Sequence, residues 1–166
     1  MSATNLEGQQ AQEKYKELTD GIDFCMMNTG LDERPIPSIP MSTKKVDSNG
    51  KTWFLSNKNS DHNKNLEKDA HTQLIYANPK GFEFLSAFGK TTISTDQSKI
   101  DELYGPSDDN WFEGKNDPNI TVLCFEPDNA KYWDTKSNMV VTALKMGYGT
   151  ITGQKMDISE TGELAL

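Results

Sequence analysis

The chain has 166 residues, of which 34% are hydrophobic, and it carries a net charge of −8 at pH 7. This length suits one domain with a modest core, and the acidic balance argues against nucleic acid or anionic membranes as partners. Since no apolar run approaches the ~18 residues of a membrane-spanning helix and no signal peptide opens the chain, we expect a cytoplasmic protein.

The N-terminal part of the chain predicts one helix and then strands. The proline-rich segment 34–40 is expected to be extended and confined to an edge. Asn49-Gly50 marks a hairpin turn, because this dipeptide adopts the positive φ angles of tight hairpins. In chain order, the expected elements are a helix at residues 13–19 and strands at residues 22–28, 40–46 and 51–56.

The rest of the chain predicts short helices between further strands. Ser60 or Asp61 can cap one helix, and Thr95 or Asp96 can cap another. Residues 137–145 fit a helix and a strand equally well. In chain order, the expected elements are a helix at 61–69, a hairpin of 72–77 with 83–93, a helix near 96–104, and strands at 120–126 and 130–134.

This order of elements indicates the α+β class. The connections are short and no alternation of strand and helix of the parallel-sheet kind occurs, so we expect a small antiparallel barrel or sandwich with peripheral short helices. The expected boundaries are a flexible N-terminal segment at 1–9, one domain at 10–150 and a polar C-terminal tail at 151–166.

The loop at residues 56–64 is a candidate phosphate seat. It joins a strand to a helix N-terminus, where backbone N–H groups point outward and favour an anion. Residues 44–68 hold six Lys and three acidic residues, a net charge of +3 in an acidic chain. The alternative is a solvated Lys/Asn loop without a ligand.

Other chemistry is weakly indicated. Cys25 and Cys124 lie in apolar runs and are expected to be buried free thiols, although a disulfide is left open. His62 and His71 are nine residues apart in polar surroundings and are expected at the surface. Asp108-Asp109 is expected in a solvated acidic loop. No phosphate-binding, zinc or nucleophile motif occurs, so a cofactor would have to supply any chemistry.

Ten short segments, taken in order, resemble the pyridoxamine 5'-phosphate oxidase-like flavin-binding split barrels, most closely the bacterial general stress protein subgroup. No single segment is specific to this family, but the order and spacing of all ten over about residues 10–150 are specific to it. The segments are Pro40-Met41-Ser42-Thr43, Thr52-Trp53-Phe54-Leu55-Ser56, Ser60-x-His62, Leu66-x-x-Asp69, Tyr76-Ala77-Asn78-Pro79, Ser86-x-Phe88-Gly89-Lys90, Lys99-Ile100-x-x-Leu103-Tyr104, Trp111-Phe112, Asp117-Pro118 and Tyr132-Trp133-Asp134.

The resemblance implies a six-stranded antiparallel split β-barrel that forms a homodimer with FMN at the subunit interface. It implies flavin contacts from two strands and the loop that follows them, with aromatic residues of the other subunit nearby. The implied cofactor-binding residues are Met41, Ser42, Thr43, Phe54, Leu55, Ser56, Ser60, His62, Lys64, Trp111 and Trp133.

The chain departs from the family pattern at two positions. Ile39 stands where the family usually has Arg, and His62 stands where it usually has Lys. Each charge-assisted hydrogen bond contributes roughly 1.5–3 kcal/mol, so losing both would weaken FMN binding by about 10²–10⁴-fold. Arg34, the single Arg of the chain, lies too far along the sequence to replace Ile39 in place.

The sequence therefore predicts an FMN-binding flavoprotein of the general stress type, with flavin-dependent oxidation and reduction as its reaction class. It disfavours true pyridoxamine phosphate oxidase activity, because that reaction needs cations for the substrate phosphate as well. The alternatives are a non-catalytic dimer that has lost its flavin, or the same fold with a deazaflavin or a haem, whose axial ligand would be His62 or His71.

Overall fold

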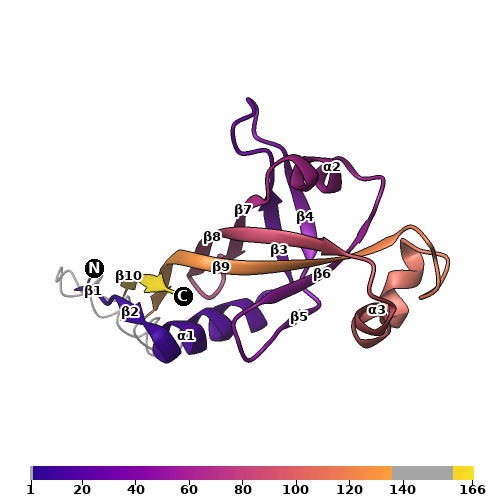
Figure 1. Ribbon diagram of the computed structural model, residues 1–166. Coiled ribbons are helices and arrows are strands. Elements are labelled where there is room, and N and C mark those ends of the chain that lie inside the picture. Colours follow the sequence, from indigo (N-terminus) through magenta and orange to yellow (C-terminus); the bar gives the residue numbers. More distant parts are fainter. Residues whose placement is uncertain (1, 136–158) are drawn as a thin grey trace.

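The computed structural model describes residues 2–135 and 159–166 (Figure 1). Its helices are α1 (Gly8–Asp20), α2 (Asp61–Lys68), α3 (Gln97–Leu103) and the 3-10 turn η1 (Pro106–Asn110). Its strands are β1 (Ser2–Ala3), β2 (Leu6–Glu7), β3 (Phe24–Asn28), β4 (Ser38–Ser42), β5 (Lys45–Val46), β6 (Thr52–Asn57), β7 (His71–Asn78), β8 (Glu83–Ser94), β9 (Ile120–Thr135) and β10 (Ser159–Ala165).

Antiparallel pairs join the six main strands in the order β4-β3-β7-β8-β9-β6. The long strand β9 pairs with β8 along one edge, and its other edge is shared by β6 and β10. The short strands β1 and β2 add to β10 in parallel. The α+β split barrel that the sequence predicted is confirmed, with these extra strands at one end.

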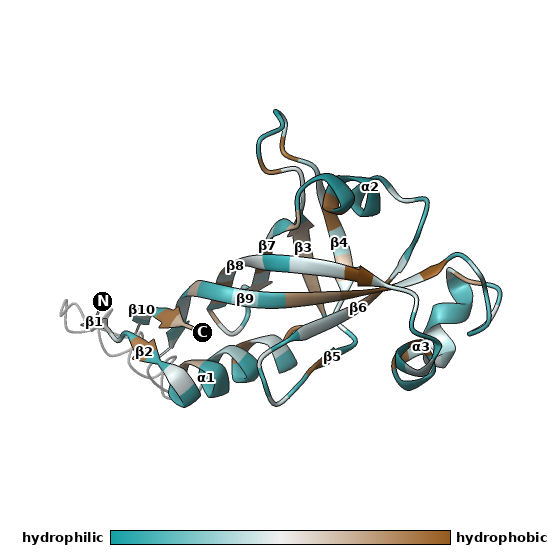
Figure 2. Cartoon of the chain, viewed as in Figure 1, coloured by the Kyte–Doolittle hydropathy of each residue, from teal (hydrophilic) through white to brown (hydrophobic). Residues whose placement is uncertain are grey.

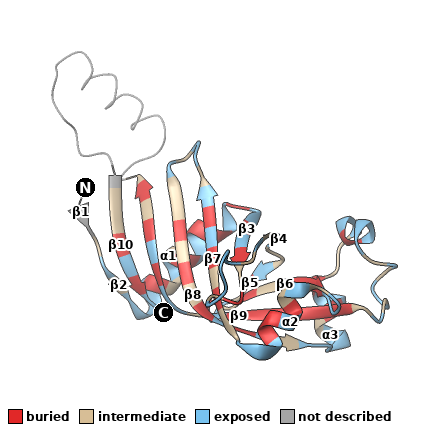
Figure 3. Cartoon of the chain, turned by 90° about the horizontal axis from the view of Figure 1, so that it is seen from above, coloured by how far each residue is buried: buried red, intermediate tan, exposed pale blue. Residues whose placement is uncertain are grey.

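Strand β8 changes register against β9 between Phe88 and Gly89, which is a β-bulge. A Cβ atom at Gly89 would lie 2.1 Å from the Glu126 carbonyl oxygen, so a glycine is required where the two backbones approach. Buried residues alternate with more exposed ones along these strands, as Figure 3 shows. One face of the sheet therefore covers the core.

The main core fills the inside of the barrel and is covered by α1, which contributes Ala11, Tyr15 and Leu18. Figure 2 shows hydrophobic residues gathered on the strands, whereas the helices are mainly hydrophilic on the side in view. Two buried phenols find hydroxyl partners, because the Tyr15 oxygen lies 2.7 Å from Thr52 Oγ1 and the Tyr76 oxygen 2.8 Å from Thr43 Oγ1. The core is thus apolar with satisfied polar groups.

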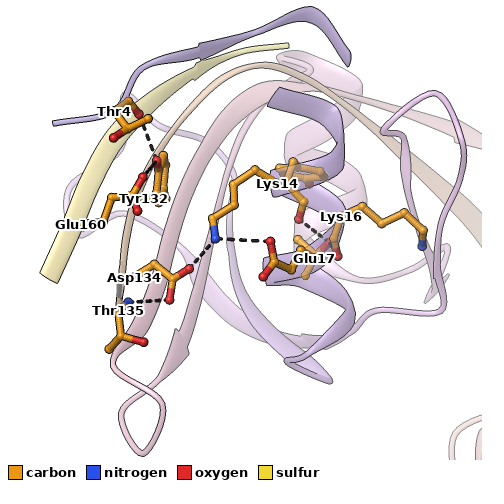
Figure 4. A network of polar contacts seen from close by, with 10 residues as sticks. Thr4, Lys14, Lys16, Glu17, Tyr132, Asp134, Thr135 and Glu160 are labelled. Carbon is orange, nitrogen blue, oxygen red and sulfur yellow. Dashed lines mark hydrogen bonds and ion pairs between the residues drawn. The ribbon is translucent and has the colours of Figure 1, made fainter. Parts of the chain in front are cut away.

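Polar contacts attach α1 to the end of the sheet (Figure 4). Lys14 forms ion pairs with Asp134 on β9 and with Glu17 on its own helix. Two residues earlier on the same strand, at 3.0 Å each, Tyr132 donates to the Thr4 carbonyl oxygen or to Glu160. These contacts fix the N-terminal segment, α1 and β10 to one strand.

A smaller cluster forms where α3 covers the outer side of β6 and β9. Leu55, Ile100, Leu103, Ile120 and Val122 make up its buried part. Asp96 caps α3 by accepting from the Ser98 backbone N–H at 2.9 Å. This cluster places the turn η1 beside β6.

The observed elements differ from expectation in three places. The predicted strands 120–126 and 130–134 form one continuous strand, because the Pro127 position falls at the bulge. The predicted strand 40–46 is interrupted between β4 and β5. Strands β1, β2 and β10 lie in the segments expected to be a flexible N-terminus and a tail; the predicted domain limits stay a prediction. The segment 137–145 lies outside the described residues.

Candidate functional site

A cleft of about 370 Å³ lies between the edge of β4 and the start of the α2 loop after β6. Strand β4 ends the sheet order, so within the described ranges its second edge carries unpaired backbone N–H and C=O groups. The volume falls within the range of small-molecule sites. Its lining residues are Phe24, Ile39, Pro40, Met41, Ser42, Lys44, Leu55, Ser56, Asn57, His62, Asp108, Trp111 and Phe112.

The walls of the cleft are mostly apolar and aromatic. Met41 and Leu55 supply aliphatic surface from the two strands, and Phe112 packs against the α3 cluster. Trp111 is 79% exposed and Phe24 62% exposed, so two large rings stand at the mouth with little to cover them. Such walls suit a flat aromatic ligand.

At the α2 end of the cleft, hydroxyl groups surround His62. Its Nε2 atom lies 2.5 Å from Ser56 Oγ and 3.0 Å from Ser60 Oγ. Ser60 caps α2 by accepting from the Asn63 backbone N–H at 3.3 Å. The expectation that His62 is a surface residue holds only in part, since the loop folds it against β6 and leaves it half-buried.

Proton counting assigns the tautomer of His62. Thr121 donates its one hydroxyl proton to the Ser56 carbonyl oxygen, so it accepts from the Asn63 amide nitrogen. The Asn63 amide oxygen then accepts from Ser56 Oγ at 3.1 Å. Because the Ser56 proton is used there, His62 Nε2 must donate its own proton toward Ser56 or Ser60.

This arrangement makes His62 a hydrogen-bond donor and not a general base toward Ser56. Burial lowers the pKa of His62, against an opposing effect of nearby Asp61, so the imidazole is neutral at pH 7. A serine nucleophile needs a base that accepts its proton. The Ser56 and His62 pair therefore does not form a hydrolytic dyad.

The cation that lines the cleft is already paired. Lys44 Nζ donates to both carboxylate oxygens of Asp108, at 2.9 and 2.7 Å, and both side chains are largely buried. Asp108 also accepts from the Gly105 backbone N–H at 2.8 Å. The expected solvated loop is wrong at Asp108, because η1 folds this carboxylate onto Lys44, in the link between β4 and β5.

Most of the positive charge around the predicted phosphate seat is compensated by ion pairs. Four of the lysines that gave the segment 44–68 its excess of positive charge form ion pairs with acidic residues, some of which come from distant elements. These pairs are Lys44 with Asp108, Lys45 with Glu102, Lys51 with Glu126 and Lys64 with Asp61. Lys58 donates to the Pro118 carbonyl oxygen at 3.2 Å.

The structure brings together some of the predicted cofactor-binding residues. Ser60 contacts the cleft through His62, and the residues that line the cleft directly are Met41, Ser42, Leu55, Ser56, His62 and Trp111. All of these stay predicted contacts.

Four other predicted residues lie elsewhere in this chain. Phe54 is fully buried in the main core, and Thr43 bonds to buried Tyr76. Lys64 is exposed beside Asp61. Trp133 lies on β9 opposite Phe84, at the far side of the sheet. The resemblance also implied aromatic contacts from another subunit, which one chain does not test.

Several lining residues were not predicted as contacts. Phe24 sits on β3, and its outward position follows from the alternation of that strand. Lys44 and Asp108 meet only through tertiary structure, so no local pattern marks them. Asn57 and Phe112 were within predicted segments but were not singled out.

Other candidate chemistry is limited. Both cysteines are free and buried, as predicted, and burial raises the pKa of Cys25 to about 12 and that of Cys124 to about 11. In residues 2–135 and 159–166, no group of three or more His, Cys, Asp or Glu is arranged to hold a metal ion. No helix in these ranges is both long and apolar enough to cross a membrane.

The described strands thus form an antiparallel split barrel with an aromatic cleft at the edge of β4. The sequence model described as "Pyridoxamine 5'-phosphate oxidase like" matches residues 10–157. The chain therefore belongs to the pyridoxamine 5'-phosphate oxidase-like family. No match was found among curated proteins.

Solved structures share the fold. A candidate general stress protein 26 of Jannaschia sp. CCS1 is 20% identical, with a TM-score of 0.77 over 96% of this chain and 100% of that chain. A general stress FMN/FAD binding protein of Xanthomonas citri is 24% identical, with a TM-score of 0.67 over 80% and 94%. A protein of Clostridium acetobutylicum related to general stress protein 26 is 21% identical, with a TM-score of 0.66 over 80% and 94%.

Proposed function

We propose that this chain binds a flavin in the cleft beside β4, with FMN as the expected form. The observation that carries the proposal is the cleft of about 370 Å³ with aromatic walls beside a free strand edge. Membership of the family supports it, as does the similar fold of the Xanthomonas citri protein whose name includes FMN/FAD binding.

The residues present fit the ring system of a flavin. Trp111, Phe112 and Leu55 would contact its apolar surface, and Ser42 with the unpaired backbone groups of β4 would bond to its polar edge. His62 and Ser60 would lie toward the ribityl chain and phosphate, as the family resemblance implies. A bound flavin supplies hydride and electron transfer.

The reaction class that follows is flavin-dependent oxidation and reduction. True pyridoxamine phosphate oxidase activity is disfavoured, because a second phosphate would need further cations. Arg34 lies in an exposed loop, where it donates to the carbonyl oxygens of Leu31 and Glu33. It is therefore already engaged away from the cleft.

We also propose that the chain forms a homodimer through the outer face of the sheet, defined by Phe24, Met26, Pro40 and Ile75. Met26 pairs with Pro40 on one side and with Ile75 on the other, so these side chains form a row across three strands. The exposed fractions of Phe24, Met26 and Ile75 are 62%, 40% and 43%. An exposed apolar face of this kind is typical of an interaction site, and a dimer interface above ~2,000 Å² would cover it.

The cytoplasmic location expected from the sequence stays a prediction. The free buried thiols of Cys25 and Cys124 agree with a reducing compartment.

The absorbance spectrum of the purified protein tests the proposed cofactor. Bound flavin gives a yellow protein, and FMN added to colourless protein should lose fluorescence as it binds. A Soret band would indicate haem instead. No binding of any flavin would support the non-catalytic dimer.

Matched substitutions on β4 locate the site. Ser42→Trp places a ring in the cleft, and we expect FMN binding to weaken by at least about tenfold. Ser38→Trp is the control, since Ser38 is exposed on the same strand but does not line the cleft. Equal FMN affinity of both variants would place the flavin elsewhere.

A further inference from the structure

The positive charge in the cleft is compensated before any ligand arrives. Lys44 donates two hydrogen bonds to Asp108, and this ion pair is largely buried. Separating it would leave an unpaired carboxylate away from water, which is unfavourable. Lys44 is therefore held by Asp108 and is poorly placed to leave it for a ligand phosphate.

The imidazole at the α2 end adds no charge either. His62 is neutral at pH 7, and its Nε2 proton points at the Ser56 and Ser60 hydroxyl groups. Asp61 and Lys64 form an ion pair at 2.9 Å on the same helix, so their charges compensate each other beside His62. Among the cleft-lining residues that the structure describes, none offers an unpaired cation.

By contrast, the part of the cleft that is proposed to bind the flavin ring has the groups it needs. Aromatic side chains and the free β4 edge are present, and neither depends on the missing charges. In the lining of the cleft, the phosphate of FMN, with a charge of about −2 at pH 7, would meet hydroxyl groups and the N–H groups of α2. Lys58, outside that lining, already donates to the Pro118 carbonyl oxygen.

We propose that the cleft recognises a flavin by its ring system and gains little from the phosphate, so that riboflavin and FMN bind with similar affinity. This inference rests on the proposed function. It names neutral, planar heteroaromatic rings as the ligand class and leaves the 5'-phosphate as a minor contact.

Titrations with riboflavin and FMN, followed by flavin fluorescence, test the inference at pH 7.5. We expect the two dissociation constants to agree within about threefold, and the FMN value to change little with added salt. One charge-assisted hydrogen bond would contribute about tenfold or more. FMN binding that is about 30-fold tighter than riboflavin binding would overturn the inference while supporting flavin binding.

His62→Lys introduces the missing charge at the same place. It should tighten FMN binding about 5- to 30-fold more than riboflavin binding, in a salt-dependent way. His71→Lys is the matched control, because His71 stacks on Phe88 outside the cleft and should change neither ligand.

The outcomes separate the two proposals. If neither flavin binds wild-type protein, the proposed function fails and this inference falls with it. If both bind but His62→Lys tightens riboflavin as much as FMN, position 62 contacts the ring and the inference is wrong.

Discussion

At the scale of single residues, neighbours on one strand have opposite roles. Phe54 is fully buried in the main core, whereas Trp53 faces the α3 cluster. The Trp53 indole donates to Asp47 at 3.0 Å and lies under Lys99 Nζ, 4.4 Å from the ring centre. The side-chain alternation of a strand explains this division.

Replacing Phe54 with Ala should lower the free energy of unfolding by about 3–5 kcal/mol, because it leaves a cavity in the core. Urea denaturation measures this change. Phe82→Ala is the control, since Phe82 is 50% exposed and its loss should cost much less. Equal effects would show that Phe54 does not face the core.

His62 should make stability depend on pH. Because burial lowers its pKa in the folded protein, the unfolded chain binds a proton more readily. Stability should therefore fall as pH drops through about 6.5, the ordinary His value, until the folded-state group is also protonated. The free energy of unfolding between pH 8 and 5 measures this.

His62→Gln is the matching variant for that experiment, because an amide N–H can still donate to Ser56 but does not titrate. The difference in stability between wild type and this variant should shrink or reverse at low pH. A difference that is constant from pH 8 to 5 would contradict a neutral, half-buried imidazole.

At the scale of elements, strand β9 organises the fold. It pairs with β6, β8 and β10, and it carries Asp134, which meets Lys14 of α1. Strand β10 adds Leu164 to the main core. The C-terminal strand is thus part of the barrel end and not a loose extension.

Leu164→Ala tests the role of β10. Leu164 is 1% exposed, so its truncation should lower the free energy of unfolding by about 2–5 kcal/mol. Glu163→Ala, the exposed neighbour on the same strand, should stay within about 0.5 kcal/mol of wild type. Thermal or urea unfolding of the two variants gives the comparison, and a neutral Leu164→Ala would place β10 outside the core.

At the scale of the whole molecule, one side of the sheet is covered and the other is open. Helix α1 packs on the inner side, whereas the outer face defined by Phe24, Met26, Pro40 and Ile75 has no covering element among the described residues. Phe24 belongs both to this face and to the cleft. Dimer formation and ligand binding are therefore expected to be coupled.

Light scattering should give twice the 18.6 kDa chain mass at micromolar concentration. Met26→Glu should shift the protein toward monomer, because it would bury a charge in the proposed interface. Gln10→Glu, at an exposed position of α1, adds the same charge elsewhere and should leave the mass unchanged. A monomeric wild type would remove the dimer and any flavin contact from a second subunit.

The sequence alone determined most of the elements, the helix caps at Ser60 and Asp96, and the family, because periodicity, capping and turn residues act over a few neighbours. It also located the strand and loop that line the cleft. Only the tertiary structure decided the charge of that cleft. Lys44 meets an acid 64 residues away, and His62 becomes half-buried when α2 folds against β6. Such pairings depend on distant parts of the chain meeting, and no local pattern encodes them.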